Sequence, residues 1–183
     1  MLPTLSDVLT QPFTLEYVAE LSAADPEHRY ELSRGTLTIM PPADDDHNAI
    51  VTELIVWLMT GRFTAREVLA NSGIRTSRDD GGIGRSPDVM VRVPPREGSG
   101  RTVWLDPEDV LLVVEVVSSG SEDLDRIIKP REYAEAGVPW FWRVERDGEP
   151  TVMIHRLNGD TYDLVDIVAL DELVIRPAPV LDA

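Results

Sequence analysis

One stretch limits the possible folds of this chain more than any other. Residues 110–117 read Val-Leu-Leu-Val-Val-Glu-Val-Val, so the run is apolar except for Glu115. An apolar run of this length, rich in valine and without alternation, predicts a strand that is buried on both faces. We therefore expect an α/β or α+β fold with a mixed central sheet flanked by helices. With 183 residues, the chain is long enough to build such a core as a single domain over residues 1–183.

The remaining elements fall into three segments around this strand. Residues 13–40 predict a short helix followed by a β-hairpin that turns at Arg34-Gly35. Residues 46–144 predict a long, mostly apolar helix, several short strands and a second helix. Residues 151–176 predict a closing meander with a turn at Asn158-Gly159.

Two places inside the middle segment need separate comment. The glycine-rich residues 80–84 are typical of a flexible loop. Pro130 interrupts the second helix. It either kinks that helix or lies in the first turn of a further one, where proline is tolerated.

The charge of the chain bears on its partners. Seventeen basic residues against thirty-three acidic ones give a net charge of −16. A surface of that sign repels phosphate backbones at long range, which argues against a protein that coats or slides along nucleic acid. It leaves open an enzyme with a small local basic channel, or one that brings divalent cations to a phosphate.

Other classes are excluded by what the sequence lacks. Without cysteine there are no disulfides, no thiolate zinc sites and no cysteine nucleophile. No apolar run approaches the ~20 residues needed to span a membrane. The first residues have neither the basic start nor the apolar stretch of a signal peptide. We therefore expect a cytoplasmic protein without a membrane partner.

Lysine occurs once, at Lys129, among sixteen arginines. Arginine is permanently charged and forked, whereas lysine is a compact point charge whose pKa can be shifted. The single lysine is therefore a candidate for a role that arginine cannot fill. Chance is the alternative, and composition does not decide between the two.

Glu115 is the anomaly in the apolar strand, because a buried carboxylate costs several kcal/mol unless a cation or donors compensate it. A structural ion pair with an arginine is one interpretation. A second carboxylate, Asp88, follows Pro87 at the start of a predicted strand, and the short connection to residues 110–117 allows the two strands to be neighbours. Two carboxylates on adjacent strands, with open positions for water and substrate, are typical of a Mg²⁺ site.

Several short motifs, taken in order, resemble the "putative restriction endonuclease" family of bacteria. They are Ser86-Pro87-Asp88-Val89, Val114-Glu115-Val116-Val117-Ser118, Lys129, Tyr133 and Ala136-Gly137-Val138-Pro139-Trp140-Phe141-Trp142. The hairpin motif Tyr30-Glu31-Leu32-Ser33-Arg34-Gly35 and the helix that opens at His47 are similar to the family's N-terminal half. The resemblance covers about residues 13–170. It implies a nuclease of the PD-(D/E)XK superfamily, in which an Asp, a Glu and a Lys act with a divalent metal on phosphodiesters.

The chain departs from the superfamily pattern at one position. The lysine is expected two residues after the glutamate, on the same face of the strand, but that residue is Val117. The resemblance then implies that the lysine has moved to the following helix, where Lys129 is the only lysine. On helical spacing Asp125, Lys129 and Tyr133 form one stripe, which would point toward Glu115.

The resemblance implies a Mg²⁺-dependent endonuclease, with Mn²⁺ as an alternative ion, that hydrolyses DNA by metal-activated water. Its catalytic residues would be Asp88, Glu115 and Lys129, with both acids on the metal and residues 46–144 as the catalytic core. The aromatic strand at residues 140–142 and the exposed meander edge favour a homodimer. The alternative is a catalytically silent module that uses the same fold to bind nucleic acid or a protein partner.

Further residues are candidates for auxiliary roles. Glu31 either adds a metal or water contact or is an exposed strand acid. His47 either touches substrate or is a polar residue at a helix start, and Tyr133 either assists Lys129 or packs in the core. Local positive charge for a nucleic acid is predicted from five arginines, Arg75, Arg78, Arg85, Arg126 and Arg131.

Overall fold

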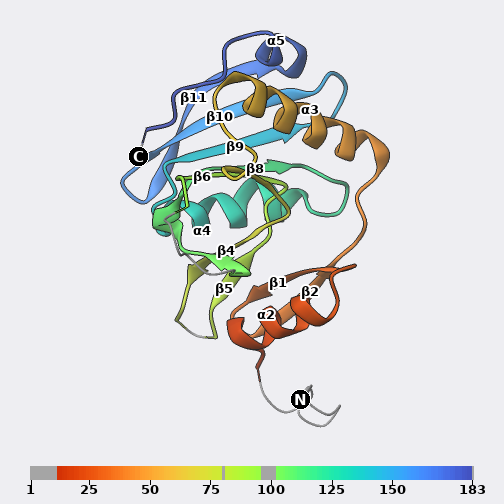
Figure 1. Cartoon of the computed structure of the whole chain (residues 1–183), viewed down its shortest axis with the longest axis vertical. Coiled ribbons are helices and arrows are strands. Elements are labelled where there is room, and N and C mark those ends of the chain that lie inside the picture. The colour runs from red at the N-terminus through yellow and green to blue at the C-terminus, as the bar shows by residue number, and fades with distance from the viewer. Residues whose placement is uncertain (1–11, 80, 96–101, 183) are drawn as a thin grey trace.

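The computed structural model describes residues 12–79, 81–95 and 102–182, and a six-stranded mixed sheet forms its centre (Figure 1). The strand β8 lies inside this sheet, parallel to β9 and antiparallel to β6. Six of its seven residues are buried, so the predicted central strand is confirmed. In spatial order the strands are β11 (Thr161–Ala169), β10 (Thr151–Asn158), β9 (Trp140–Glu145), β8 (Val110–Val116), β6 (Val89–Arg92) and β3 (Val68–Ala70).

A second mixed sheet contains the N-terminal hairpin. The predicted hairpin is confirmed, and at its turn Arg34 and Gly35 both have positive φ, 49° and 81°. A two-residue turn with both φ values positive matches the twist of the strands it joins. The order of this sheet is β2 (Thr36–Met40), β1 (Arg29–Ser33), β5 (Ile83–Arg85), β4 (Gly73–Ser77) and β7 (Trp104–Leu105).

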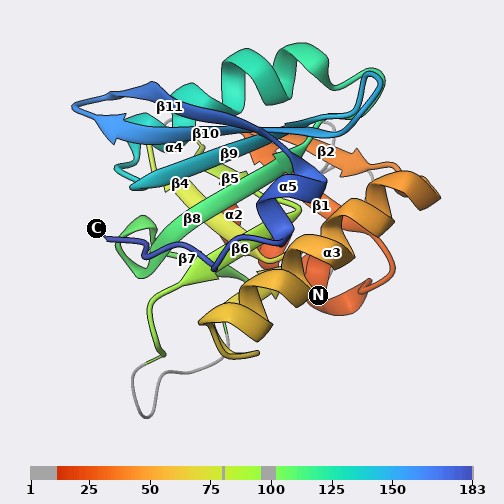
Figure 2. The same ribbon diagram turned by 90° about the horizontal axis from the view of Figure 1, so that it is seen from above.

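Helices cover both faces of the six-stranded sheet, as Figure 2 shows. The long helix α3 (Asp45–Gly61) and the short α5 (Leu170–Val174) pack on one face, against residues such as Val114 and Trp142. The helix α4 (Lys129–Glu135) packs on the other, against Val113 and Phe141. The helix α2 (Leu15–Ala24) packs on the smaller sheet. The predicted class, a mixed α+β fold with helices flanking the sheet, is confirmed.

The strand β5 corrects part of the expected flexible loop at residues 80–84, because residues 83 and 84 belong to the strand; residue 80 lies outside the described residues. Ile83 and Gly84 are buried, and β5 pairs with both β1 and β4. A Cβ added to Gly84 would lie 2.8 Å from atoms of Leu15 and Trp104. The glycine is therefore needed because α2 and β7 approach the backbone closely, rather than for flexibility.

The segment before α4 is irregular. A 3₁₀ turn (Pro107–Asp109) precedes β8, and after β8 the chain forms a π-helix, η2 (Leu124–Ile128), that runs directly into α4. Pro130 lies in the first turn of α4, which is the second of the two predicted arrangements. No helix in the three described ranges has the length and apolar character that a membrane crossing requires.

Candidate active site

Two carboxylates meet on neighbouring strands of the six-stranded sheet. In the antiparallel pairing of β6 with β8, Val89 lies opposite Val114. Continuing that register by one residue places Asp88, directly before β6, opposite Glu115. Residues that oppose each other in an antiparallel pair project from the same face, which here is the face covered by α4. Asp88 is 5% exposed and Glu115 is 2% exposed, so both carboxylates are buried.

The ammonium of Lys129, at the start of α4, lies among three carboxylates. Its Nζ is 3.0 Å from Glu115 Oε2, 3.0 Å from Asp125 Oδ1 and 3.4 Å from Glu31 Oε1. Asp125 comes from η2, one turn earlier. One turn later, Tyr133 donates its hydroxyl proton to Glu115 Oε1 at 2.6 Å. The three residues of the predicted helical stripe therefore face Glu115.

Asp88 is held by three donors. The backbone N–H of Val116 donates to Oδ2 at 2.9 Å. Oδ1 lies 3.1 Å from Nε2 of His47 and 3.2 Å from Nη1 of Arg29. The other ring nitrogen of His47 lies 3.1 Å from Ser118 Oγ. His47 is thus fixed between the end of the β8 segment and Asp88, and it is 4% exposed.

Glu31 belongs to the same buried network and is 1% exposed, so it is not an exposed strand acid. Its Oε1 accepts the backbone N–H of Ser86 at 3.1 Å, and its Oε2 accepts from Arg85 Nη1 at 3.0 Å. Arg85 also donates through Nε and Nη2 to both oxygens of Glu132, at 2.6 and 2.8 Å. The guanidinium of Arg85 is therefore paired with two acids of the protein, Glu31 and Glu132.

Burial acts to raise the pKa of both central acids, but their neighbours shift the two pKa values apart. It raises the pKa of Glu115 to about 8, although the ammonium of Lys129 opposes the shift. The neighbouring carboxylates raise that pKa further. Burial acts on Asp88 in the same direction. The hydrogen bond and charge of His47, with the Val116 N–H and the charge of Lys129, together outweigh it, so the pKa of Asp88 is lowered. Asp88 is therefore the more acidic of the pair.

The two helical groups keep their protons at neutral pH. Burial on its own would lower the pKa of Lys129, but the charges of Glu115 and the two other acids around it raise the pKa overall. Burial, followed by the charge of Glu115, raises the pKa of Tyr133 well above its usual value. Tyr133 is thus a hydrogen-bond donor and Lys129 a fixed positive charge.

The donor set fits a hard divalent cation held by few protein ligands. Within residues 12–79, 81–95 and 102–182, no three His, Asp or Glu side chains converge as a ready metal cage. Asp88 and Glu115 supply two carboxylates, and three of their four oxygens each have one partner in the contacts above, which leaves a lone pair. Mg²⁺ is usually held by one or two carboxylates together with water and substrate phosphates. Asp125 Oδ1 lies 3.0 Å from the Lys129 ammonium and accepts no hydrogen bond within the described residues, so it is a further buried oxygen beside the lysine.

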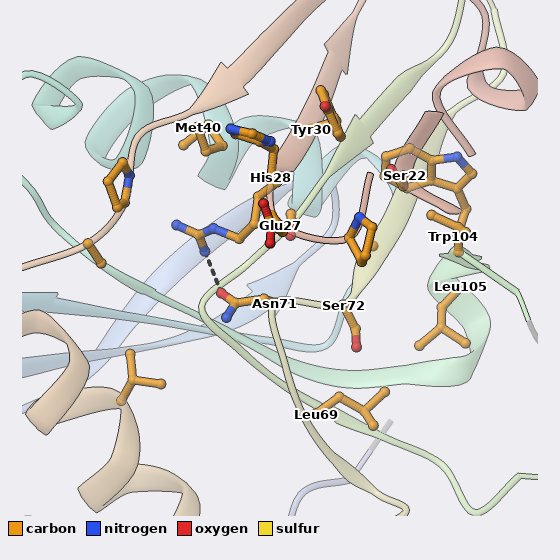
Figure 3. Close-up of a pocket in the computed structure, with 18 of the residues that line it drawn as sticks. Ser22, Glu27, His28, Tyr30, Met40, Leu69, Asn71, Ser72, Trp104 and Leu105 are labelled. Carbon is orange, nitrogen blue, oxygen red and sulfur yellow. Dashed lines mark hydrogen bonds between the residues drawn. The ribbon is translucent and has the colours of Figure 1, made fainter. Parts of the chain in front are cut away.

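A pocket of about 950 Å³ opens beside this cluster, between the N-terminal hairpin and the loop that joins β3 to β4 (Figure 3). Three of its lining residues, Arg29, His47 and Ser86, contact Asp88 or lie close to it in sequence. Among the described residues that line the pocket, Glu27 is the single acid. The pocket therefore gives Asp88 an approach that is not acidic, although the chain as a whole is.

The five arginines predicted to contact nucleic acid lie elsewhere. Arg85 is buried, as described above. The remaining four are paired with acids: Arg75 and Arg78 with Asp106, Arg126 with Glu145, and Arg131 with Glu135. None of the five is among the described residues that line the pocket. The basic side chains at the pocket are instead Arg29 and Arg92.

The sequence did not identify Arg29 as a site residue, and it placed Asp125 in the helical stripe without indicating a role for it. Arg29 lies 59 residues before its partner Asp88, and nothing in its local pattern distinguishes it from a surface residue of a hairpin. Asp125 stood in the predicted helical stripe, but only burial of that stripe makes it part of the lysine's surroundings. The signal that found Lys129 was its rarity, and arginine is too common in this chain to give one.

Comparison with known proteins identifies the family and the fold. The model of the Uma2 family, described as "Putative restriction endonuclease", matches residues 15–182. A search of curated proteins found no match. Among solved structures, the fold is similar to a putative nuclease belonging to DUF820 from Anabaena variabilis ATCC 29413. That likeness has a TM-score of 0.60 and 17% identity, and it covers 90% of this chain and 83% of the other.

The family match spans both sheets and every residue of the buried cluster. The expected family is therefore confirmed, and the chain belongs to the Uma2 family of putative restriction endonucleases.

Proposed function

We propose that this protein is a Mg²⁺-dependent endonuclease that hydrolyses phosphodiester bonds of DNA. The observation that carries the proposal is the position of the single lysine. Its ammonium lies 3.0 Å from Glu115, on the face of the sheet where Asp88 and Glu115 project together. A lysine beside Glu115, with Asp88 on the same face of the sheet, matches the set of residue types expected of the superfamily, even though the lysine comes from a helix.

The roles follow from the contacts of each group. Asp88 and Glu115 would hold the cation, Mg²⁺ or Mn²⁺, which when bound polarises the phosphate and lowers the pKa of a bound water. Lys129 supplies positive charge where negative charge develops during phosphoryl transfer. Tyr133 orients Glu115 through its hydrogen bond, and His47 orients Asp88. These two are positioning residues, because they act through the acids.

The proposal extends to the assembly and the compartment. Leu164, Val165 and Ile167 on the edge strand β11 are about half exposed, at 48%, 57% and 54%. An apolar edge strand favours pairing with a second copy, so we propose a homodimer, to be measured by sedimentation at micromolar concentration. A DNA substrate also implies a cytoplasmic site of action.

The experiment is cleavage of a labelled DNA in Mg²⁺, Mn²⁺ and EDTA by the parent chain and by Lys129→Arg. We expect cleavage by the parent in either metal and none in EDTA. Lys129→Arg should lose cleavage, because a planar fork does not fit among three close carboxylates. Overpacking should lower its free energy of unfolding by about 1–3 kcal/mol, so circular dichroism must confirm that the variant is folded.

Arg131→Lys is the matched control, because Arg131 is an exposed residue of the same helix that pairs with Glu135. It should cleave like the parent. Cleavage by Lys129→Arg at the parental rate would remove the lysine from the mechanism. Binding of DNA without metal-dependent cleavage by the parent would support the second candidate, a silent module. The net charge of −16 is the observation that favours that candidate.

A further inference from the structure

Arg29 differs from the other charged groups of the cluster in its access to solvent. The side chains of Asp88, Glu115 and Lys129 are 7%, 2% and 3% exposed, whereas that of Arg29 is 25% exposed. Arg29 is the first residue of β1 and lines the pocket. Its guanidinium therefore lies between the pocket and the buried acids. It contacts Asp88 on one side and is accessible from the pocket on the other.

The hydrogen bond from Arg29 to Asp88 is weak for a contact between a guanidinium and a carboxylate. It is a single contact of 3.2 Å to an oxygen that His47 already contacts. By contrast, Arg85 binds both oxygens of Glu132 with two donors at 2.6 and 2.8 Å. Within the described residues, the Nε and Nη2 groups of Arg29 have no hydrogen-bond partner. A guanidinium with such donors at a pocket wall is suited to a planar or tetrahedral oxyanion such as a phosphate.

Asn71 holds the guanidinium in place at this wall. Its side-chain oxygen accepts from Nη1 of Arg29, as the dashed line in Figure 3 shows. Asn71 has a φ of 50°, in the left-handed region, and its backbone N–H donates to the carbonyl of Asp88 at 3.3 Å. The loop that carries Asn71 is therefore tied to the residue that Arg29 contacts, which keeps the arginine at the mouth of the site.

A metal cation bound to Asp88 would compete with the guanidinium of Arg29 for the Asp88 carboxylate. Both groups are positive, and the guanidinium already contacts Oδ1. A divalent ion at Asp88 therefore favours movement of Arg29 away from the acid. The space beside it is the pocket, whose described lining contains one acid. An anionic substrate in that pocket supplies the guanidinium with a new partner.

We infer that Arg29 binds a phosphate of the nucleic acid in this pocket, and that its contact with Asp88 is the arrangement without metal and substrate. This inference rests on the proposed nuclease function. It gives Arg29 two opposing effects, since the same side chain attracts the phosphate and competes with the metal for Asp88.

The test uses Arg29→Gln and measures binding rather than cleavage. A fluorescein-labelled single-stranded oligonucleotide is titrated in Ca²⁺, by anisotropy, at several salt concentrations. Arg29→Gln should bind it about tenfold more weakly, as expected for a lost hydrogen bond to a charged group. The slope of log affinity against log salt should also fall by about 0.7, the value for one phosphate contact on a single strand.

Calorimetric titration with Mn²⁺ supplies the second readout. Removing a competing positive charge should leave Mn²⁺ affinity unchanged or raise it. If Arg29 served only to position Asp88, the affinities of Arg29→Gln for Mn²⁺ and for the oligonucleotide would both fall. Arg156→Gln is the matched control, because Arg156 is a half-exposed arginine paired with Asp182 outside the pocket lining.

The outcomes separate the two proposals. Parental oligonucleotide affinity and salt slope in Arg29→Gln, with a parent chain that cleaves, would overturn the role of Arg29 alone. A parent chain that neither cleaves nor binds the oligonucleotide would overturn the nuclease function, and the inference with it. Weaker oligonucleotide binding together with undiminished Mn²⁺ binding, in a variant with the parental circular dichroism spectrum, supports the inference.

Discussion

At the scale of one residue, Glu115 shows what the proposed active site costs in stability. It is a carboxyl inside a buried strand, surrounded by other acids and balanced mainly by Lys129. An apolar residue at this position would make a better core strand. The cost is visible in its pKa, which burial raises to about 8. A divalent cation is the partner that would favour its ionised form.

This shift predicts how metal-free stability depends on pH. Because the folded state holds the proton of Glu115 more tightly than the unfolded state, stability should fall as pH rises from about 5 to 8. Asp88 adds no slope in this window. Its pKa is lowered, so its contribution is complete above the ordinary value and is lost only at more acidic pH.

The measurement is urea unfolding in EDTA at pH 5.5 and pH 8, for the parent and for Glu115→Gln. The amide does not titrate, so the variant should show a smaller decline than the parent. The repulsion among the other acids is common to both chains and cancels in the comparison. An equal decline in the two chains would mean that Glu115 is already ionised at pH 5.5.

At the scale of elements, local patterns predicted what is set locally. The alternation around Arg34-Gly35 predicted the hairpin, and the apolar run predicted β8. The face that carries Glu31 was also recognisable as opposite to that of Leu32. Whether the Glu31 face is buried depends on Arg85 and on α4, which arrive from distant parts of the chain. Burial of that face was therefore not predictable from the hairpin alone.

The short strands β5 and β7 were missed for the same reason. They have three and two residues, too few for a period to appear, and they exist because neighbours pair with them. The glycines that suggested flexibility are required by close packing. The π-helical turn of η2 has no sequence signature that we recognise, yet the residue types of the helical stripe still placed Lys129 beside Glu115.

The close packing of β5 under α2 gives a prediction at this scale. Gly84→Ala should lower the free energy of unfolding by about 1–3 kcal/mol, because its Cβ would lie 2.8 Å from Leu15 Cδ2 and from the ring of Trp104. In a Leu15→Ala background one of the two side chains that the added Cβ would meet is removed. The same substitution should then lower the free energy of unfolding by less. Urea unfolding of the four chains in this double-mutant cycle measures the coupling. Strictly additive costs would show that α2 does not press on β5.

At the scale of the whole molecule, the net charge and the site act in opposite directions. A chain with a net charge of −16 repels DNA at a distance. The pocket beside Asp88, in contrast, is lined by Arg29 and Arg92 and by a single acid among its described residues. For the proposed DNA substrate, local contacts would determine where it binds, and the overall field would slow its approach. Acidic side chains instead gather around another groove of about 550 Å³, whose lining includes five acids and two arginines: Asp46, Glu53, Glu122, Glu145, Asp147, Arg126 and Arg146.

Neutralising acids outside the pocket lining should therefore speed the association of DNA without changing the site. Glu53, Asp147 and Asp160 are exposed and do not line the pocket beside Asp88, so the triple variant Glu53→Gln, Asp147→Asn, Asp160→Asn reduces the net charge by three units. Its association rate with a labelled oligonucleotide in Ca²⁺, measured by stopped flow, should exceed the parental rate several-fold at about 10 mM salt. At about 150 mM salt the Debye length is near 8 Å and the difference should shrink. Dissociation should stay parental at both salts, because no contact in the pocket changes. A difference between the two chains that is the same at both salt concentrations would mean that these acids act through local contacts with DNA and not through the field of the whole molecule.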